Sequence, residues 1–380
     1  MRNLVFMVAF GDRCLEEFDL IYPPILGFGN DVLLITDKNI KRKGVEVLQF
    51  SKPEETQEMY KFRVHIYRVF DFSLYDSVCY MDTDVIMRRN IFEKYNEMFF
   101  LIYTNGHFIT PAIAKKLADL GNVTVAISVE GMEDLTDERR GKGAFKKVLE
   151  AFKNLREAGV PFGISVTTTT KNAELLLKEK FYDFYFNKQG VSYMWQFQLM
   201  PVGYGRRAME LTINPQQRLK LYRKWEEYMK EKKYCIADFW NSGVLSDGCL
   251  AYGKDGGYLY VNWEGNVMPC VFVPYYVDNV IDLFKKGKTL WDALQSDFFK
   301  RGRKWQEEYK KNKDNWLMPC SIRDHYKNWR ENIATKDIKP ENKDAEAAIK
   351  SKEYRQALEE FDDEVEKTTI PIWKKEYLEE

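Results

Sequence analysis

The chain has 380 residues, of which 45% are apolar and 31% are charged, which is a globular composition with length for two or three domains. Lys plus Arg and Asp plus Glu both total 58, so the formal net charge is zero and offers no support for a nucleic-acid partner. No window approaches the ~20 apolar residues that span a bilayer. With no export signal, the six cysteines indicate a cytoplasmic chain with thiols or cluster ligands.

The first 98 residues alternate compact apolar runs with a segment of helical periodicity. The expected strands are Leu4–Ala9, Val32–Thr36, Val45–Phe50 and Ser77–Met81, and the expected helix is Glu54–Phe72. Strands that alternate with helices favour a parallel, doubly wound α/β sheet, so this segment is expected to form a Rossmann-like βαβ half-domain.

From residue 99 the pattern starts again. The expected strands are Phe99–Tyr103, Val123–Val129, Pro161–Thr167 and Tyr193–Met200. Thr110 is expected to cap the first helix between them, and Gly121 follows its end. This run of βα units predicts a partial barrel over residues 99–245.

A different architecture is expected after residue 245. Tyr258–Asn262 and Val267–Val271 flank a short turn and predict a β-hairpin within a small domain at 246–325. The charged remainder, 326–380, predicts a helical tail with one amphipathic helix over Glu341–Glu366.

Three cysteines surround this hairpin. Fifteen residues separate Cys249 from Gly265, four separate Gly265 from Cys270, and Cys320 follows in a later loop. Thiolates held by rigid β structure suit an iron–sulfur cluster. Zinc is the competing interpretation but usually uses tight C-x₂-C pairs, and spacing alone also allows plain core thiols.

A fourth ligand for such a cluster has three candidates. Cys235 precedes Cys249 by 14 positions, and His325 follows Cys320 by five. Imidazole can replace thiolate on iron. An iron left open for substrate or water is the third alternative.

The segments around these cysteines resemble the auxiliary domain of radical-SAM proteins, of the SPASM or shorter twitch type. The resemblance is carried by residues 248–251, 258–262, 265–273 and 318–320. It implies that Cys249, Cys270 and Cys320 hold an auxiliary [4Fe–4S] cluster.

The barrel segment resembles the same superfamily. The matching stretches are residues 103–106, 126–131, 140–145 and 163–167. The resemblance implies that Ser128 and Glu130 approach the ribose of S-adenosylmethionine (SAM) and that Arg140 lies near its carboxylate.

The cysteine trio that starts radical-SAM chemistry is missing from this sequence. The family uses C-x₃-C-x₂-C, whereas no two cysteines here have fewer than 13 residues between them. The family's Gly-Gly-Glu-Pro element is missing as well. We therefore expect at most partial SAM binding and no radical initiation.

Residues 1–98 resemble the first half of a GT-A glycosyltransferase. The match rests on residues 75–85, which contain Asp82-Thr83-Asp84, and on residues 8–12. The resemblance implies that Asp82 and Asp84 hold Mn²⁺ or Mg²⁺ against a donor diphosphate, with Arg63 or Arg68 contacting the sugar or diphosphate. The second half of such an enzyme has no counterpart here.

The first functional hypothesis is an iron–sulfur protein of the radical-SAM superfamily, similar to oxidoreductases and maturases that act on a peptide or a small molecule. The second is a nucleotide-sugar glycosyltransferase or binder that depends on Mn²⁺ or Mg²⁺. The third is a non-catalytic chimera of two half-domains.

Overall fold

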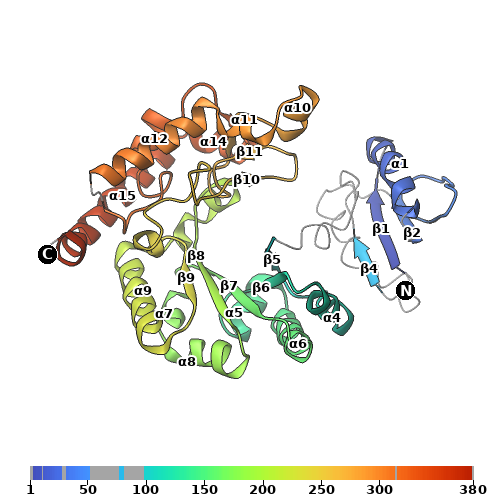
Figure 1. Cartoon of the computed structure of the whole chain (residues 1–380), viewed down its shortest axis with the longest axis horizontal. Coiled ribbons are helices and arrows are strands. Elements are labelled where there is room, and N and C mark those ends of the chain that lie inside the picture. Colours follow the sequence, from blue (N-terminus) through green and yellow to red (C-terminus); the bar gives the residue numbers. More distant parts are fainter. Residues whose placement is uncertain are drawn as a thin grey trace. The chain divides into compact units, whose positions relative to one another are not determined.

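The computed structural model describes residues 3–10, 12–27, 31–51, 77–80, 98–312 and 315–378 (Figure 1). The chain divides into two compact units. The first comprises residues 1–102, 108–124 and 154–160, and the second comprises residues 103–107, 125–153 and 161–380.

The N-terminal sheet contains four strands in the order β3-β2-β1-β4, and its pairs are parallel. The strands are β1 (Asn3–Ala9), β2 (Asp31–Thr36), β3 (Val45–Gln49) and β4 (Ser77–Tyr80), and helix α1 spans Asp12–Gly27. Alternate residues of β1 and β2 enter separate apolar clusters, which is why both strands read as continuous apolar runs. The predicted parallel strands are confirmed, whereas the predicted helix Glu54–Phe72 lies outside the described residues.

A second sheet has five strands in the order β5-β6-β7-β8-β9, and β6 to β9 pair in parallel. The strands are β5 (Phe100–Thr104), β6 (Val123–Val129), β7 (Phe162–Thr168), β8 (Tyr193–Gln198) and β9 (Ile236–Asp238). The helices are α4 (Pro111–Leu120), α5 (Glu133–Arg140), α6 (Ala144–Glu157), α7 (Ala173–Leu176), α8 (Glu179–Tyr182) and α9 (Pro215–Glu227). Thr110 caps α4 through Ile113 N–H, as predicted, and Gly121 ends it at φ 71°.

The C-terminal region surrounds a short antiparallel hairpin. Strand β10 (Tyr260–Val261) pairs with β11 (Val267–Met268), and β12 (Tyr275–Tyr276) pairs with β13 (Lys339–Pro340). The helices are α10 (Val280–Lys285), α11 (Leu290–Leu294), α12 (Asp297–Lys311), α13 (Tyr326–Asn328), α14 (Lys343–Lys350) and α15 (Lys352–Trp373). The hairpin is confirmed but shorter than predicted, because Asn262 Oδ1 already accepts the turn N–H groups of Glu264 and Asn266.

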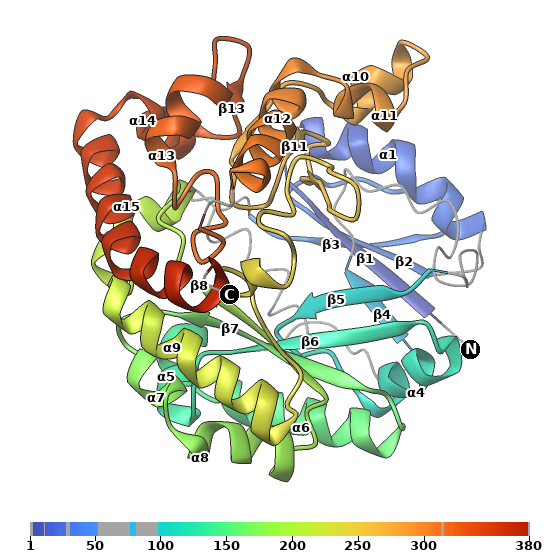
Figure 2. The same cartoon turned by 60° about the vertical axis from the view of Figure 1, so that its left-hand side comes forward.

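The prediction of one tail helix over Glu341–Glu366 is wrong. Two helices, α14 and α15, meet at Ser351, whose backbone is extended with φ −78° and ψ 125°. The Ser351 hydroxyl accepts the N–H of Tyr354 at 3.1 Å and thereby begins a new helix. Helix α15 then runs beside α9 (Figure 2).

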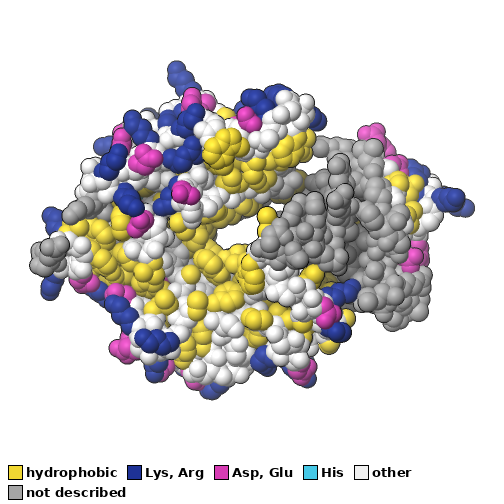
Figure 3. Space-filling model, in the orientation of Figure 1, with side chains coloured by type: hydrophobic (Ala, Val, Ile, Leu, Met, Phe, Trp, Pro, Cys, Tyr) yellow, Lys and Arg dark blue, Asp and Glu magenta, His cyan; other side chains and the backbone are white. Residues whose placement is uncertain are grey.

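Apolar side chains also reach the surface of the second unit. They gather on α10 and α11, where Ile281, Phe284 and Trp291 are all more than half exposed (Figure 3). Among the described residues, no helix combines the length and apolar character that crossing a membrane requires.

Candidate functional site

The thiols of Cys249, Cys270 and Cys320 lie in one neighbourhood of the second unit. Burial raises the pKa of all three thiols. Cys249 further raises the pKa of Cys270, and both raise that of Cys320, so the three groups interact electrostatically. Three segments far apart in the sequence thus pack at one apolar cluster, and an iron–sulfur cluster held by these cysteines stays a prediction.

Tyr258 is the closest polar neighbour of Cys270. Its hydroxyl lies 2.7 Å from Cys270 Sγ, and the backbone N–H of Phe272 points to the same sulfur at 3.4 Å. Burial raises the pKa of Cys270 to about 12, and these two hydrogen bonds work in the opposite direction. The sequence contained Tyr258 in the hairpin motif, but only its position opposite the thiol reveals this contact.

A buried ion pair fixes the loop that carries Cys320. Asp324 accepts the Cys320 N–H at 3.1 Å and pairs with Arg218 at 2.6 Å. Arg218 also donates to the carbonyl of Leu317 at 2.7 Å, so both ends of the loop are tied to α9. Because each charge is bonded, burial of the pair is tolerated and the loop geometry is set. No sequence signal linked Arg218 to this loop.

The two other ligand candidates have different surroundings. Cys235 is exposed and immediately precedes β9. His325 Nε2 lies 2.8 Å from the carbonyl oxygen of Met318, and its ring packs against Trp305 and Tyr309. The identity of a fourth ligand therefore stays a prediction.

The donor set fits an iron–sulfur cluster better than a single ion. Among the described residues, no group of three or more His, Cys, Asp or Glu is arranged to hold one metal ion. In a cluster, each thiolate binds a different iron, so the sulfurs need not converge on one point. The three cysteines pack at the same apolar cluster of the second unit and supply the thiolate donors that an iron–sulfur cluster uses.

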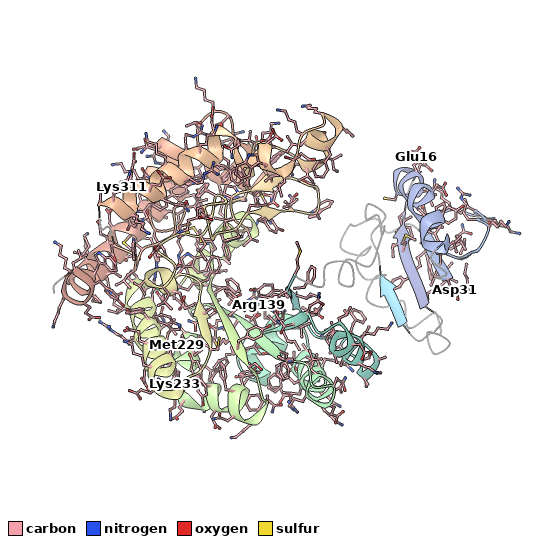
Figure 4. All side chains as sticks on the ribbon, viewed as in Figure 1. Glu16, Asp31, Arg139, Met229, Lys233 and Lys311 are labelled. Atoms are coloured by element: carbon pink, nitrogen blue, oxygen red, sulfur yellow. The ribbon has the colours of Figure 1, made fainter. Side chains whose placement is uncertain are left out.

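The residues predicted near SAM lie around the end of β6. Ser128 is half-buried on the strand, opposite Ser165 of β7, and Glu130 is buried just beyond it. Glu130 binds Arg140 at 2.6 and 2.9 Å and Arg139, labelled in Figure 4, at 2.6 Å. Glu130 and Arg140 therefore form an ion pair with each other.

The remaining predicted residues belong to the N-terminal segment. Asp82 and Asp84 lie outside the described residues, as do Arg63 and Arg68. The Mn²⁺ or Mg²⁺ site therefore stays a prediction.

The family model described as "Radical SAM superfamily" matches residues 38–174. Residues 38–174 of this chain are therefore similar to a radical SAM superfamily domain. The match begins within the segment that resembled a glycosyltransferase, and the comparisons give that second resemblance no support.

Two of the curated relatives are named as a synthase and as a maturation protein. An AdoMet-dependent heme synthase of Methanosarcina barkeri is 26% identical over 222 residues, 51% of this chain and 60% of the relative. The sporulation killing factor maturation protein SkfB of Bacillus subtilis is 33% identical over 91 residues, 24% of this chain and 21% of the relative. The chain thus spans three fifths or less of these relatives.

Among solved structures, native anSMEcpe with bound AdoMet and Cp18Cys peptide aligns over 98% of this chain and 99% of its own. The sequence identity is 15% and the TM-score is 0.41.

Proposed function

We propose that this chain is a radical SAM superfamily protein that holds an auxiliary [4Fe–4S] cluster on Cys249, Cys270 and Cys320. The observation that carries the proposal is that three cysteines from separate segments pack at one apolar cluster, with the Tyr258 hydroxyl 2.7 Å from Cys270 Sγ. The sequence spacing around Gly265 supports it.

The chain's own residues would serve such a cluster in defined ways. The three thiols lose their protons on binding, because thiolate is the ligand form. The Tyr258 hydroxyl donates a hydrogen bond to Cys270 Sγ, and the Lys254 ammonium interacts favourably with Cys249. Asp324 holds the backbone of Cys320. When bound, the cluster supplies one-electron transfer.

We further propose that the chain by itself does not start radical chemistry, since its sequence has no C-x₃-C-x₂-C trio. Ser128, Glu130 and Arg140 remain the proposed SAM contacts, and SAM would compete with Glu130 for Arg140. The proposed substrate class is a peptide or a small molecule. The names of the relatives, a maturation protein and a synthase, are compatible with either.

Anaerobic reconstitution of the full chain with iron and sulfide tests the cluster. We expect broad visible absorbance and about four irons per chain. The Cys249→Ser, Cys270→Ser and Cys320→Ser variants should each lose iron, while Cys14→Ser, on α1, should keep it. Less than one iron per chain, or zinc in its place, rejects the proposal.

Two further measurements complete this experiment. Iron loss in Cys235→Ser or in His325→Gln identifies the fourth ligand, and retention in both indicates an open iron. Incubation of the loaded protein with SAM and dithionite should release no methionine above a protein-free control. Catalytic cleavage of SAM would overturn the proposed lack of initiation.

A further inference from the structure

A cavity of about 200 Å³ lies in the second unit, and one of its lining residues, Arg323, follows Cys320 by three positions. Its walls come from the segment after β8, from the beginning of α9 and from α15. Helices α9 and α15 contact each other (Figure 2). Most of its lining is apolar, including Pro201, Ile213 and Leu358. The space equals roughly seven water molecules at about 30 Å³ each.

Arg323 lines this cavity with an incompletely bonded guanidinium. The side chain is fully buried, and its Nη1 donates to Gln198 Oε1 at 2.9 Å. Its Cζ lies 5.3 Å from the ring centroid of Trp240 and 5.1 Å from that of Phe361. Within the described residues, Nε and Nη2 have no hydrogen-bond partner.

These two nitrogens form one edge of the guanidinium. Parallel N–H groups on such an edge match the two oxygens of a carboxylate. Buried donors without a partner destabilise the fold, so an incoming carboxylate would remove an unfavourable contribution to the free energy.

Two of the three neighbouring carboxyl groups are engaged elsewhere, and the third, Asp362, has one oxygen without a partner among the described residues. Asp324 binds Arg218, and Asp238 accepts from Asn241 and from the Trp240 backbone. Asp362 Oδ2 accepts the N–H of Tyr326, and burial raises the pKa of this carboxyl to about 9, so it is neutral at pH 7. None of the three bonds to the free edge of Arg323.

Two further features favour an anion here. Thr212 lines the cavity, and its buried hydroxyl has no hydrogen-bond partner among the described residues. Asn214 and Pro215, the cap and first residue of α9, also line it, which turns the positive end of the helix dipole toward the cavity. Exposed Asn214 and Glu364 mark the side open to solvent, and the Glu364 carboxylate disfavours a second negative charge.

We propose that this cavity binds a small monocarboxylate with a short apolar body, whose carboxylate pairs with the Nε and Nη2 edge of Arg323. Both nitrogens are closed to water in the ligand-free conformation. Phe361 lines the cavity and stacks on the guanidinium, so it rotates aside when the carboxylate enters. The apolar body then contacts the aliphatic wall. Arg323 belongs to the loop that carries Cys320, so binding is measured on iron-free protein, without the cluster.

Calorimetry on the iron-free, full-length protein tests the site with straight-chain carboxylates from butyrate to octanoate. We expect at least one of them to bind about tenfold more tightly than its uncharged amide, which has the same shape and cannot form the ion pair. No heat with any carboxylate, equal affinity of the amide, or equally tight binding of inorganic phosphate overturns the proposal.

Variants then locate the binding. Ala357 is half-buried and lines the cavity, so Ala357→Phe should fill it and abolish binding while Arg323 stays in place. Gln356→Phe adds the same ring at the exposed neighbouring position and should bind normally. Arg323→Lys, which keeps the charge but loses the two-pronged edge, should weaken binding about tenfold. Unchanged affinity in Ala357→Phe would place the ligand elsewhere and reject the site.

Discussion

At the scale of single residues, the hydroxyl of Tyr258 controls the ease with which Cys270 ionises. Burial raises the pKa of the Cys270 thiol to about 12, while the hydrogen bond from Tyr258, at 2.7 Å, lowers it. In Tyr258→Phe the pKa should rise further, so less thiolate is present at mildly alkaline pH. We expect slower alkylation of Cys270 in the metal-free protein, measured by peptide mass spectrometry.

Tyr260→Phe is the matched control, since Tyr260 lies on the same hairpin and its pKa is affected by burial and by Glu341 rather than by a cysteine. Removing a hydroxyl also opens the site slightly, which would speed labelling. A slower rate can therefore arise only from the pKa, and an unchanged or faster rate in Tyr258→Phe contradicts the prediction.

Asp362 should make stability depend on pH. Burial raises its pKa from 3.8 to about 9 in the folded state, so the native protein binds the proton that the unfolded chain has released. The contribution of Asp362 to the free energy of unfolding is therefore greatest below pH 4. It falls as the pH rises toward 9, by at most about 1.4 kcal/mol per pH unit.

Asp362→Asn removes this titration and should raise the melting temperature at pH 8 far more than at pH 5. An asparagine can still accept the N–H of Tyr326 that Asp362 accepts at 2.6 Å. The adjacent Asp363 is exposed, and Asp363→Asn should shift neither melting temperature. A pH-independent difference between wild type and Asp362→Asn would show that burial does not control this carboxyl.

At the scale of elements, α12 packs so closely on the cysteine region that one of its residues has to be glycine. A Cβ at Gly302 would lie 2.1 Å from Cδ1 of Tyr252, which is fully buried and has a left-handed backbone at φ 65°. The Tyr252 hydroxyl in turn contacts Ser321 Oγ at 2.9 Å, next to Cys320. Helix α12 thus supports the cysteine loop through Tyr252.

Gly302→Ala would usually stabilise a helix by about 1 kcal/mol, yet here we expect a loss of about 1–3 kcal/mol because the ring cannot move away. Urea unfolding followed by circular dichroism measures the change. Lys304→Ala, on the same helix, should stay within about 0.5 kcal/mol of wild type. A stabilised Gly302→Ala protein would mean that the ring adapts freely.

The same elements show what local sequence can and cannot predict. The strands and the hairpin were predictable because their apolar runs and turn residues act over a few positions. The break between α14 and α15 was missed, because the helical pattern continues across Ser351 and only its cap interrupts it. The pairing of Arg218 with Asp324, across 106 positions, depends on packing that no local pattern contains.

At the scale of the whole molecule, the superfamily match and the missing cysteine trio have to be reconciled. The match over residues 38–174 covers β6 and the residues around it, including Glu130 and Arg140. The sequence nevertheless lacks the thiols that would hold a SAM-cleaving cluster. The proposed chemistry is therefore concentrated in the C-terminal region, where the three remaining thiols meet.

A cluster on these thiols would also act as a cross-link. Cys249 and Cys270 flank the hairpin, whereas Cys320 belongs to a loop that is tied to α9 by Asp324 and Arg218. A ligand that binds only the folded state stabilises it in proportion to RT ln(1 + [L]/Kd).

Iron loading should therefore raise the melting temperature of the full chain, and anaerobic chelation should return it to the metal-free value. Cys320→Ser should abolish the rise because it disconnects the loop from the hairpin, while Cys14→Ser should preserve it. An equal rise in Cys320→Ser and wild type would mean that iron binds without joining the two segments.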